Sequence, residues 1–286
     1  MSLSFFDPPP ATKWNVLSLG AGVQSSALAL MASKGVIGPM PDFAIFADTQ
    51  AEPESVYKWL DWLEPQLAFP VIRVTKGNLT NDSLIVKEKD GGTKTMRKLI
   101  PLFGIKANGD KTAAIGRRCT VDYKVRPVIA EMRKRCGITH GQKEVTVTQW
   151  MGISYDELQR MKPSPERWNQ HRWPLIESRM TRTHCKEWLK ANGFPEPPRS
   201  ACYYCPFHDN TEWRRMKLED PVHFQKAVDF DIKIRELYKL EQTTLKMEVY
   251  LHSSCKPLAE IDLDSDEDKG QQVWDFSADC EGLCGI

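Results

Sequence analysis

The sequence lacks any apolar run long enough to cross a bilayer. Its first ten residues lack a basic region followed by an apolar stretch, so they do not resemble an export signal. No internal repeat is present. These absences argue against a membrane-spanning or exported protein and favour a cytoplasmic location. The 286 residues, 41% of them hydrophobic, are enough to bury a full core.

The chain also lacks an overall excess of one charge, since its formal net charge is +1. The near balance hides two opposite blocks. Residues 87–135 contain 14 Lys and Arg against 5 Asp and Glu, whereas residues 260–286 contain 9 acidic residues and one lysine. A basic block suits a phosphate-rich partner, although such a run is also typical of a solvated protein face.

Eight cysteines are present, and without an export signal they are expected to stay reduced. Clustered cysteines in a reducing compartment indicate metal or redox chemistry. Cys202 and Cys205 form a Cys-x-x-Cys turn followed by proline, which is typical of half of a zinc or iron–sulfur site. The remaining ligands could come from three other cysteines: Cys119, Cys280 and Cys284.

A glycine-rich segment, residues 20–26, lies between a predicted strand at residues 14–19 and a predicted helix at residues 27–34. Such a turn lets backbone N–H groups approach a phosphate, and the helix N-terminus adds a partial positive charge. A plain tight turn of an α/β fold would have the same glycines. Both interpretations stay open on the glycines alone.

Short apolar segments alternate with helix-like segments along the chain. The expected strands are residues 14–19, 42–47, 70–74 and 145–153, and the expected helices are residues 27–34, 54–67, 127–135, 182–192, 211–217 and 221–240. This alternation predicts an α/β fold with a doubly wound, mostly parallel sheet and a helical, cysteine-rich C-terminal part. Residues 76–118 show no clear periodicity and are expected to form a long loop.

We expect three parts: a nucleotide-binding α/β domain at residues 1–200, a Cys-x-x-Cys and helical segment at residues 201–259 packed on it, and an acidic linker with a cysteine-containing tail at residues 260–286. The linker is expected at residues 262–272, which are acidic and poor in apolar side chains.

Several motifs together resemble one known family. Residues 18–26 resemble a PP-loop, residues 48–52 resemble its second-strand motif, and residues 150–161 resemble a later Gly-Ile-x-x-Asp-Glu-x-x-Arg block. Cys119 with Lys124 and Pro127 is similar to the cysteine-lysine-proline motif of iron–sulfur adenylylsulfate reductases. The ordered set resembles the PP-loop superfamily of phosphoadenylylsulfate (PAPS) and adenylylsulfate (APS) reductases, ATP pyrophosphatases, and the sulfurtransferases of DNA phosphorothioation and tRNA thiolation.

The resemblance implies ATP or a related adenine nucleotide with Mg²⁺, and a 4Fe–4S cluster. It implies catalytic roles for Cys284, Lys124 and Asp48. The nucleotide-binding residues that it implies are Ser18, Gly20, Gly22, Gln24, Ser25, Ser26, Asp48, Thr49, Gly152 and Arg160.

The cluster would be held by Cys119, Cys202 and Cys205, with the fourth ligand left open. Cys284 or Cys280 could close the cluster, or one iron could stay open to bind a sulfur atom. The tail around Cys284 also resembles the reductase tail whose cysteine attacks the sulfonate. Two other interpretations remain: a zinc site in place of the cluster, and tail cysteines that are surface thiols.

Two departures from the family pattern point in opposite directions. Gln24 stands where ATP-hydrolysing members carry aspartate, which favours the reductases. Ser154 and Tyr155 stand where reductases carry arginines that bind the sulfonate. This argues against the reductases, because charge-assisted contacts supply most of the stabilisation of a bound sulfonate.

The first functional hypothesis is ATP-dependent sulfur transfer, in which an acceptor is adenylated with release of pyrophosphate. A nucleic-acid acceptor would dock on residues 87–135, and a sulfur donor or thiol reductant protein would be a partner; a homodimer is a further expectation. The second hypothesis is a PAPS or APS reductase with Cys284 as nucleophile. The third is a non-catalytic nucleotide-binding module with a structural or redox-sensing cluster.

Other side chains are weaker candidates. Cys136, Cys185 and Cys255 stand alone and are expected to be small buried residues. His208 is close enough in sequence to Cys205 to border the cluster, although a structural or surface role is favoured. Trp213 could stack on a base or lie on an exposed helix face.

Overall fold

The computed structural model describes residues 8–88, 94–96, 98–240 and 247–264. Cys280 and Cys284 lie outside the described residues, as does most of the predicted linker at residues 262–272. No helix in the described ranges has the length and apolar character needed to cross a membrane.

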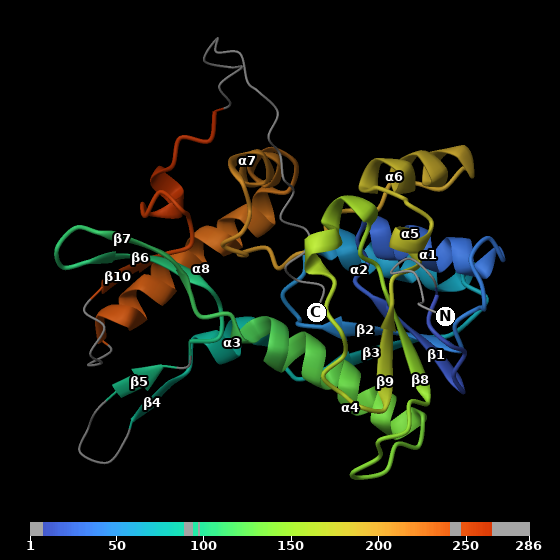
Figure 1. Cartoon of the computed structure of the whole chain (residues 1–286). Helices are drawn as coiled ribbons and strands as arrows, with labels where there is room; N and C mark the ends of the chain where they lie inside the picture. The colour runs from blue at the N-terminus through green and yellow to red at the C-terminus, as the bar shows by residue number, and fades with distance from the viewer. Residues whose placement is uncertain (1–7, 89–93, 97, 241–246, 265–286) are drawn as a thin grey trace.

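The fold is α/β and is built on a five-stranded parallel sheet (Figure 1). Its strands lie in the order β3-β2-β1-β8-β9, so the chain winds outward from β1 in both directions. The predicted parallel sheet is therefore confirmed. The strands are β1 (Trp14–Leu19), β2 (Phe43–Asp48), β3 (Val71–Thr75), β8 (Val147–Met151) and β9 (Asn169–Arg172).

Helices cover both faces of this sheet, as crossover connections in a parallel sheet require. One face packs on α1 (Val23–Ser33), α2 (Glu54–Leu63) and α6 (Arg182–Ala191), and the other packs on α4 (Arg126–Arg135). Short helical segments complete this half: η1 (Glu64–Gln66), η2 (Thr120–Val125, a π-helical turn), η3 (Tyr155–Arg160) and α5 (Pro174–Glu177).

Helix α1 begins four residues earlier than the sequence predicts. Gly22 has an extended backbone and is the N-cap, and the Ser26 N–H donates to the Gly22 carbonyl at 3.0 Å. Residues 23–32 are all buried. A helix buried on all sides has no polar stripe to mark its first turn, so the sequence did not locate its start.

Residues 76–118, predicted to be a long loop, form two small antiparallel sheets and a helix instead. One sheet pairs two strands within the segment, and the other has the order β10-β6-β7. The elements are α3 (Leu79–Ser83), β4 (Val86–Glu88), β5 (Lys94–Met96), β6 (Leu102–Lys106), β7 (Lys111–Ile115) and β10 (Met247–Tyr250). β10 pairs with β6, from which it is separated by more than a hundred residues, so the local sequence around β6 did not indicate this pairing.

A second core lies beside the sheet, under the helices of the C-terminal part (Figure 1). Helices α7 (Asn210–Glu219) and α8 (Pro221–Leu240) pack there with β6, β10 and the turn η4 (Leu258–Glu260). Trp213 on α7 is fully buried. Both predictions for it, stacking on a base and lying on an exposed face, are therefore wrong, because its ring fills this core.

Asp231 on α8 ties the end of the described chain to this second core. Its carboxylate, 1% exposed, accepts hydrogen bonds from the N–H groups of Leu251 (3.2 Å) and Leu258 (3.1 Å) and from Arg235 (3.0 Å). We expect Asp231→Ala to lower the free energy of unfolding by about 3 kcal/mol, because it leaves two buried N–H donors without an acceptor. Urea denaturation followed by circular dichroism measures this loss.

A matched control lies two residues away on the same helix. Asp229 is exposed and accepts a hydrogen bond from Gln225. We expect Asp229→Ala to change the free energy of unfolding by less than about 0.5 kcal/mol. Equal effects of the two substitutions would contradict the anchoring role of Asp231.

Candidate functional site

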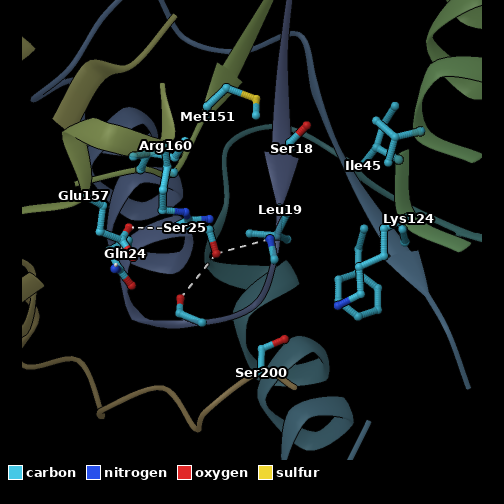
Figure 2. Close-up of a pocket in the computed structure, with 17 residues that line it drawn as sticks. Ser18, Leu19, Gln24, Ser25, Ile45, Lys124, Met151, Glu157, Arg160 and Ser200 are labelled. Atoms are coloured by element: carbon cyan, nitrogen blue, oxygen red, sulfur yellow. Dashed lines mark hydrogen bonds and ion pairs between the residues drawn. The ribbon is translucent and has the colours of Figure 1, made fainter. Parts of the chain in front are cut away.

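A pocket opens at the carboxyl ends of β1, β2 and β8, where open α/β sheets bind their ligands (Figure 2). Its empty volume, counted out to the open mouth and so including solvent space, is about 880 Å³. We call it the strand-end pocket. It is lined by Ser18, Leu19, Gly20, Gly22, Gln24, Ser25, Ile45, Phe46, Ala47, Lys124, Val128, Met151, Gly152, Ile153, Glu157, Arg160 and Ser200.

The glycine loop forms one wall of this pocket and leads directly into α1. The Ser25 hydroxyl accepts from the Gly20 N–H at 3.2 Å and donates to the Gly22 carbonyl at 3.3 Å, which holds the loop closed. Gly152 approaches so closely that a Cβ there would lie 2.9 Å from the Ser25 Cα. The arrangement places the N-terminus of α1, with its partial positive charge, at the pocket.

Seven of the ten predicted nucleotide-binding residues line the strand-end pocket: Ser18, Gly20, Gly22, Gln24, Ser25, Gly152 and Arg160. Lys124, predicted as catalytic, lines it too. Ser26, Asp48 and Thr49 are not among the lining residues. Ser26 is fully buried, and its hydroxyl accepts from the indole N–H of Trp59 at 3.0 Å. Its place inside the first turn of α1 directs it into the core.

Asp48 is held beside the pocket by α2. Its Oδ1 accepts from the Tyr57 hydroxyl at 2.8 Å and from the Gln50 N–H at 2.7 Å. Burial and the hydrogen bond to this carboxylate raise the pKa of Tyr57, so the phenol stays protonated and donates. Tyr57 was not identified from the sequence as a neighbour of a predicted site residue.

A second cavity lies on the side of Lys124 toward the C-terminal part, and we call it the cysteine cavity. Its empty volume, which includes solvent space at its mouth, is about 420 Å³. The structure brings together three predicted cluster ligands from two distant segments. The cavity is lined by Leu79, Ile100, Pro101, Arg117, Cys119, Thr120, Lys124, Cys202, Tyr204, Cys205, Pro206 and Phe207.

Three thiols around one mostly apolar cavity fit an iron–sulfur cluster, which cysteine thiolates hold. Tyr204 lines the cavity with Cys119 and Cys202, and burial together with these nearby sulfurs raises its pKa. Within the described ranges, no group of three or more His, Cys, Asp or Glu side chains is placed to hold a single metal ion. Cys280 and Cys284, the candidate fourth ligands, are outside those ranges.

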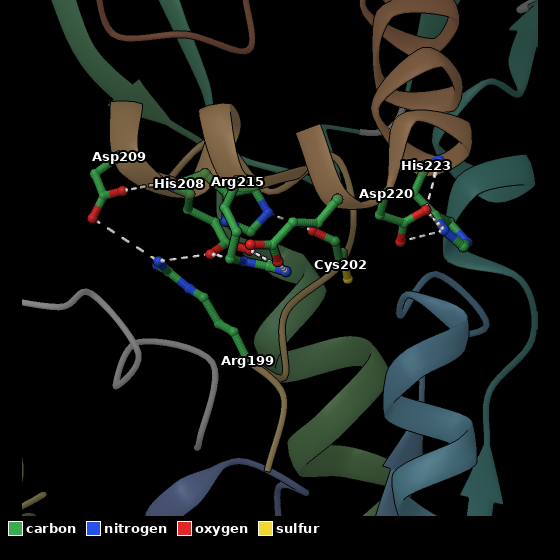
Figure 3. Close-up of polar contacts among 9 residues, drawn as sticks. Arg199, Cys202, His208, Asp209, Arg215, Asp220 and His223 are labelled. Atoms are coloured by element: carbon green, nitrogen blue, oxygen red, sulfur yellow. Dashed lines mark hydrogen bonds and ion pairs between the residues drawn. The ribbon is translucent and has the colours of Figure 1, made fainter. Parts of the chain in front are cut away.

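The Cys-x-x-Cys turn is held by hydrogen bonds to its own backbone (Figure 3). The Cys202 carbonyl accepts from the Cys205 N–H at 2.9 Å and from His208 Nε2 at 3.0 Å. Burial, together with the positive charge of Arg199, lowers the pKa of His208 to about 3. The imidazole is therefore neutral and donates from Nε2, and His208 is buried against the turn instead of lying on the surface.

Two contacts connect the turn to the carboxyl end of β2. The buried Thr49 hydroxyl lies 3.5 Å from the Cys202 sulfur, and the Tyr203 N–H donates to the Ala51 carbonyl at 3.0 Å. Lys124 lines both cavities, and its ammonium lies 3.4 Å from the buried Glu52 carboxylate. Thr49 was predicted as a nucleotide contact, whereas the structure places its hydroxyl against the sulfur of Cys202, a predicted cluster ligand.

Cys136, Cys185 and Cys255 are buried and do not line the cysteine cavity, as their isolated positions predict. Burial raises the pKa of Cys136 to about 11 and that of Cys185 to about 12. The nucleophilic thiolate is thus almost absent at pH 8. We expect iodoacetamide at pH 8 to leave both unmodified in the native protein and to alkylate both in urea, as peptide mass spectrometry would show. Rapid alkylation of Cys185 in the native protein would contradict its burial.

The strand order and parallel pairing are compatible with a Rossmann-like or PP-loop fold. Comparison of the sequence with protein-family models and with curated proteins gave no match.

Proposed function

We propose that the protein is an iron–sulfur enzyme that binds ATP and transfers sulfur to an acceptor that it first adenylates. One observation carries the proposal. The cysteine cavity and the strand-end pocket meet at Lys124, which lines both. A sulfur-carrying group and an activated phosphorus would therefore lie on two sides of one side chain.

The strand-end pocket offers different chemistry to the two ends of a nucleotide. The apolar side chains of Ile45, Val128 and Met151 suit an adenine ring. The N–H groups of the glycine loop and the N-terminus of α1 suit phosphates. Lys124 and Arg160 add positive charge, which stabilises the developing charge of a phosphoryl-transfer transition state.

The proposed reaction has two steps. An acceptor oxygen attacks the α-phosphorus of ATP, a P–O bond to the acceptor forms, and the bond to the β-phosphate breaks with release of pyrophosphate. A sulfide-level sulfur from a donor then attacks the acceptor atom that bears the AMP group: a bond from sulfur to that atom forms, its bond to the AMP oxygen breaks, and AMP leaves. When bound, a 4Fe–4S cluster would supply an iron that can carry this sulfur.

The acceptor that fits the charge pattern best is a nucleic acid docked on residues 87–135. Within this stretch Arg118, two residues before η2, and Arg126, the first residue of α4, have exposed side chains and form ion pairs with the buried Asp122. Arg117 lies over the ring of Phe207, on the rim of the cysteine cavity. Binding through phosphates would weaken steeply as the salt concentration rises.

Anaerobic purification followed by a turnover assay tests this function. We expect about four irons per chain with matching sulfide, and pyrophosphate release from ATP that depends on an added RNA or DNA acceptor. Zinc without sulfide, or a nucleotide that binds and never turns over, would contradict the proposal.

A PAPS or APS reductase is the second candidate, favoured by the neutral Gln24 amide and by the cations Lys124 and Arg160 at the same pocket. Its distinguishing result is sulfite release from a sulfonucleotide with a thiol reductant. That release should be lost in Cys284→Ala, whereas iron content should be unchanged if three cysteines hold the cluster.

A further inference from the structure

The strand-end pocket contains one acidic side chain among its described lining residues, Glu157. The carboxylate is 13% exposed and belongs to η3, which follows β8. Its Oε2 lies 2.7 Å from Arg160 Nη1 and accepts from the Gln24 amide at 3.4 Å (Figure 2). Because Gln24 is the second residue of α1, this carboxylate stands at the phosphate-binding end of the pocket.

A carboxylate at this position opposes the binding of a bare polyphosphate. Phosphate oxygens at the N-terminus of α1 would approach Glu157, and like charges that close repel in a partly buried site. Arg160 already forms an ion pair with this carboxylate, so the positive charge that it can offer to a phosphate is reduced. A divalent cation between the carboxylate and the phosphates would remove the repulsion.

The surrounding oxygens suit magnesium. Mg²⁺ in nucleotide sites is held by one or two carboxylates together with phosphate oxygens and water. The Gln24 side-chain oxygen and the fully buried Ser154 hydroxyl, which lies 3.4 Å from the Gln24 nitrogen, are oxygen donors beside Glu157. The described part of the chain places no group of three or more acidic, His or Cys side chains around one ion, so such a site would be completed by the nucleotide.

We propose that Glu157 is the protein ligand of the Mg²⁺ that accompanies the triphosphate, and that it exchanges Arg160 for this cation when the nucleotide binds. Arg160, released from the carboxylate, then contacts a phosphate. The inference rests on the proposed function, since it takes ATP as the nucleotide. It defines the substrate class as a magnesium–triphosphate and disfavours a sulfonucleotide without metal.

Calorimetric titration of ATP into the holoprotein, with Mg²⁺ or with EDTA, tests the proposal. We expect wild-type protein to bind ATP at least tenfold more tightly with Mg²⁺ than with EDTA. Glu157→Gln should bring this ratio close to one, because it removes the ligand and the repulsion together. Glu157→Asp, which keeps a carboxylate, should restore much of the ratio.

The neighbouring carboxylate is the matched control. Asp156 does not line the pocket, and it accepts a hydrogen bond from the Arg182 N–H at 3.3 Å. Asp156→Asn should keep the wild-type ratio. Electron paramagnetic resonance of Mn²⁺ provides a readout independent of ATP affinity: with ATP present, one bound ion per chain is expected in wild type and at least tenfold weaker binding in Glu157→Gln. Thermal melts show whether Glu157→Gln has folded. If it has not, the Mg²⁺ dependence of ATP binding by Glu157→Asp tests the role of the carboxylate.

The outcomes separate this inference from the function on which it rests. An unchanged Mg²⁺ dependence and unchanged Mn²⁺ binding in Glu157→Gln would overturn the role of Glu157 alone. Absence of ATP binding by wild type with or without Mg²⁺ would overturn both proposals. Tighter binding of APS than of magnesium–ATP by wild type would also overturn the inference, because the substrate would then be a sulfonucleotide.

Discussion

Replacing Cys202 with serine is expected to lower the iron content of anaerobically purified protein from about four per chain to near zero. Cys202 is 8% exposed and lines the cysteine cavity, so its replacement removes one of the three thiols that the described residues bring to this cavity. A serine hydroxyl is a poor replacement because iron in such clusters is held by thiolates. Iron and sulfide analysis, with the visible absorption spectrum, measures the loss.

Cys255→Ser is the matched control for this prediction. Cys255 is also buried, at 5% exposed, and lies in the same C-terminal part, but it does not line the cysteine cavity. We expect this variant to keep the iron content of wild type. Full iron in Cys202→Ser, or equal loss in both variants, would show that the cavity does not hold a cluster.

The second large effect is expected at Gly152. A Cβ there would lie 2.9 Å from the Ser25 Cα, closer than Cβ atoms approach other atoms in proteins, and 3.1 Å from the Ser25 backbone nitrogen, which is also tighter than most contacts. Gly152→Val adds two further methyl groups at this point. The glycine loop has to move, and α1 cannot follow because it is buried on all sides. We expect ATP affinity to fall about 100-fold, equivalent to about 2.7 kcal/mol.

Calorimetric ATP titration measures the effect, and urea denaturation measures the accompanying loss of stability, about 2 kcal/mol for an overpacked contact. Gly22→Ala provides the comparison within the same loop. The nearest atom to a Cβ at Gly22 is the Ser200 Cβ at 3.9 Å, an ordinary contact, so its effect should be much smaller. An equal loss in both variants would contradict the steric explanation.

Local patterns predicted the strands of the parallel sheet well where burial is continuous. The range predicted for β1 matches the structure, and β8 lies within its predicted range. The edge strand β9, with the sequence Asn-Gln-His-Arg, has no apolar alternation and was missed. β9 forms because its backbone pairs with β8, and the sequence pattern of one strand does not contain this information.

The candidate site also contains residues whose positions could be predicted from the local sequence and residues whose positions could not. Gly20, Gly22 and Gln24 were predictable because a strand, a glycine turn and a helix follow one another directly. The position of Ser26 was not, because the face of α1 that it occupies depends on where the helix begins. Glu157 belongs to a motif recognised in the sequence, but its contact with Gln24 exists only once η3 folds over α1.

The sequence by itself determined the α/β class, the glycine loop at the end of the first strand and the identity of the cysteines. These features depend on neighbouring residues, since apolar periodicity and turn chemistry act over a few positions. The family resemblance already placed Cys119 with Cys202 and Cys205, whereas the tertiary structure alone decided that β10 pairs with β6 and that Lys124 lies between the two cavities. Contacts between distant segments arise from packing of whole elements, and no local pattern contains them.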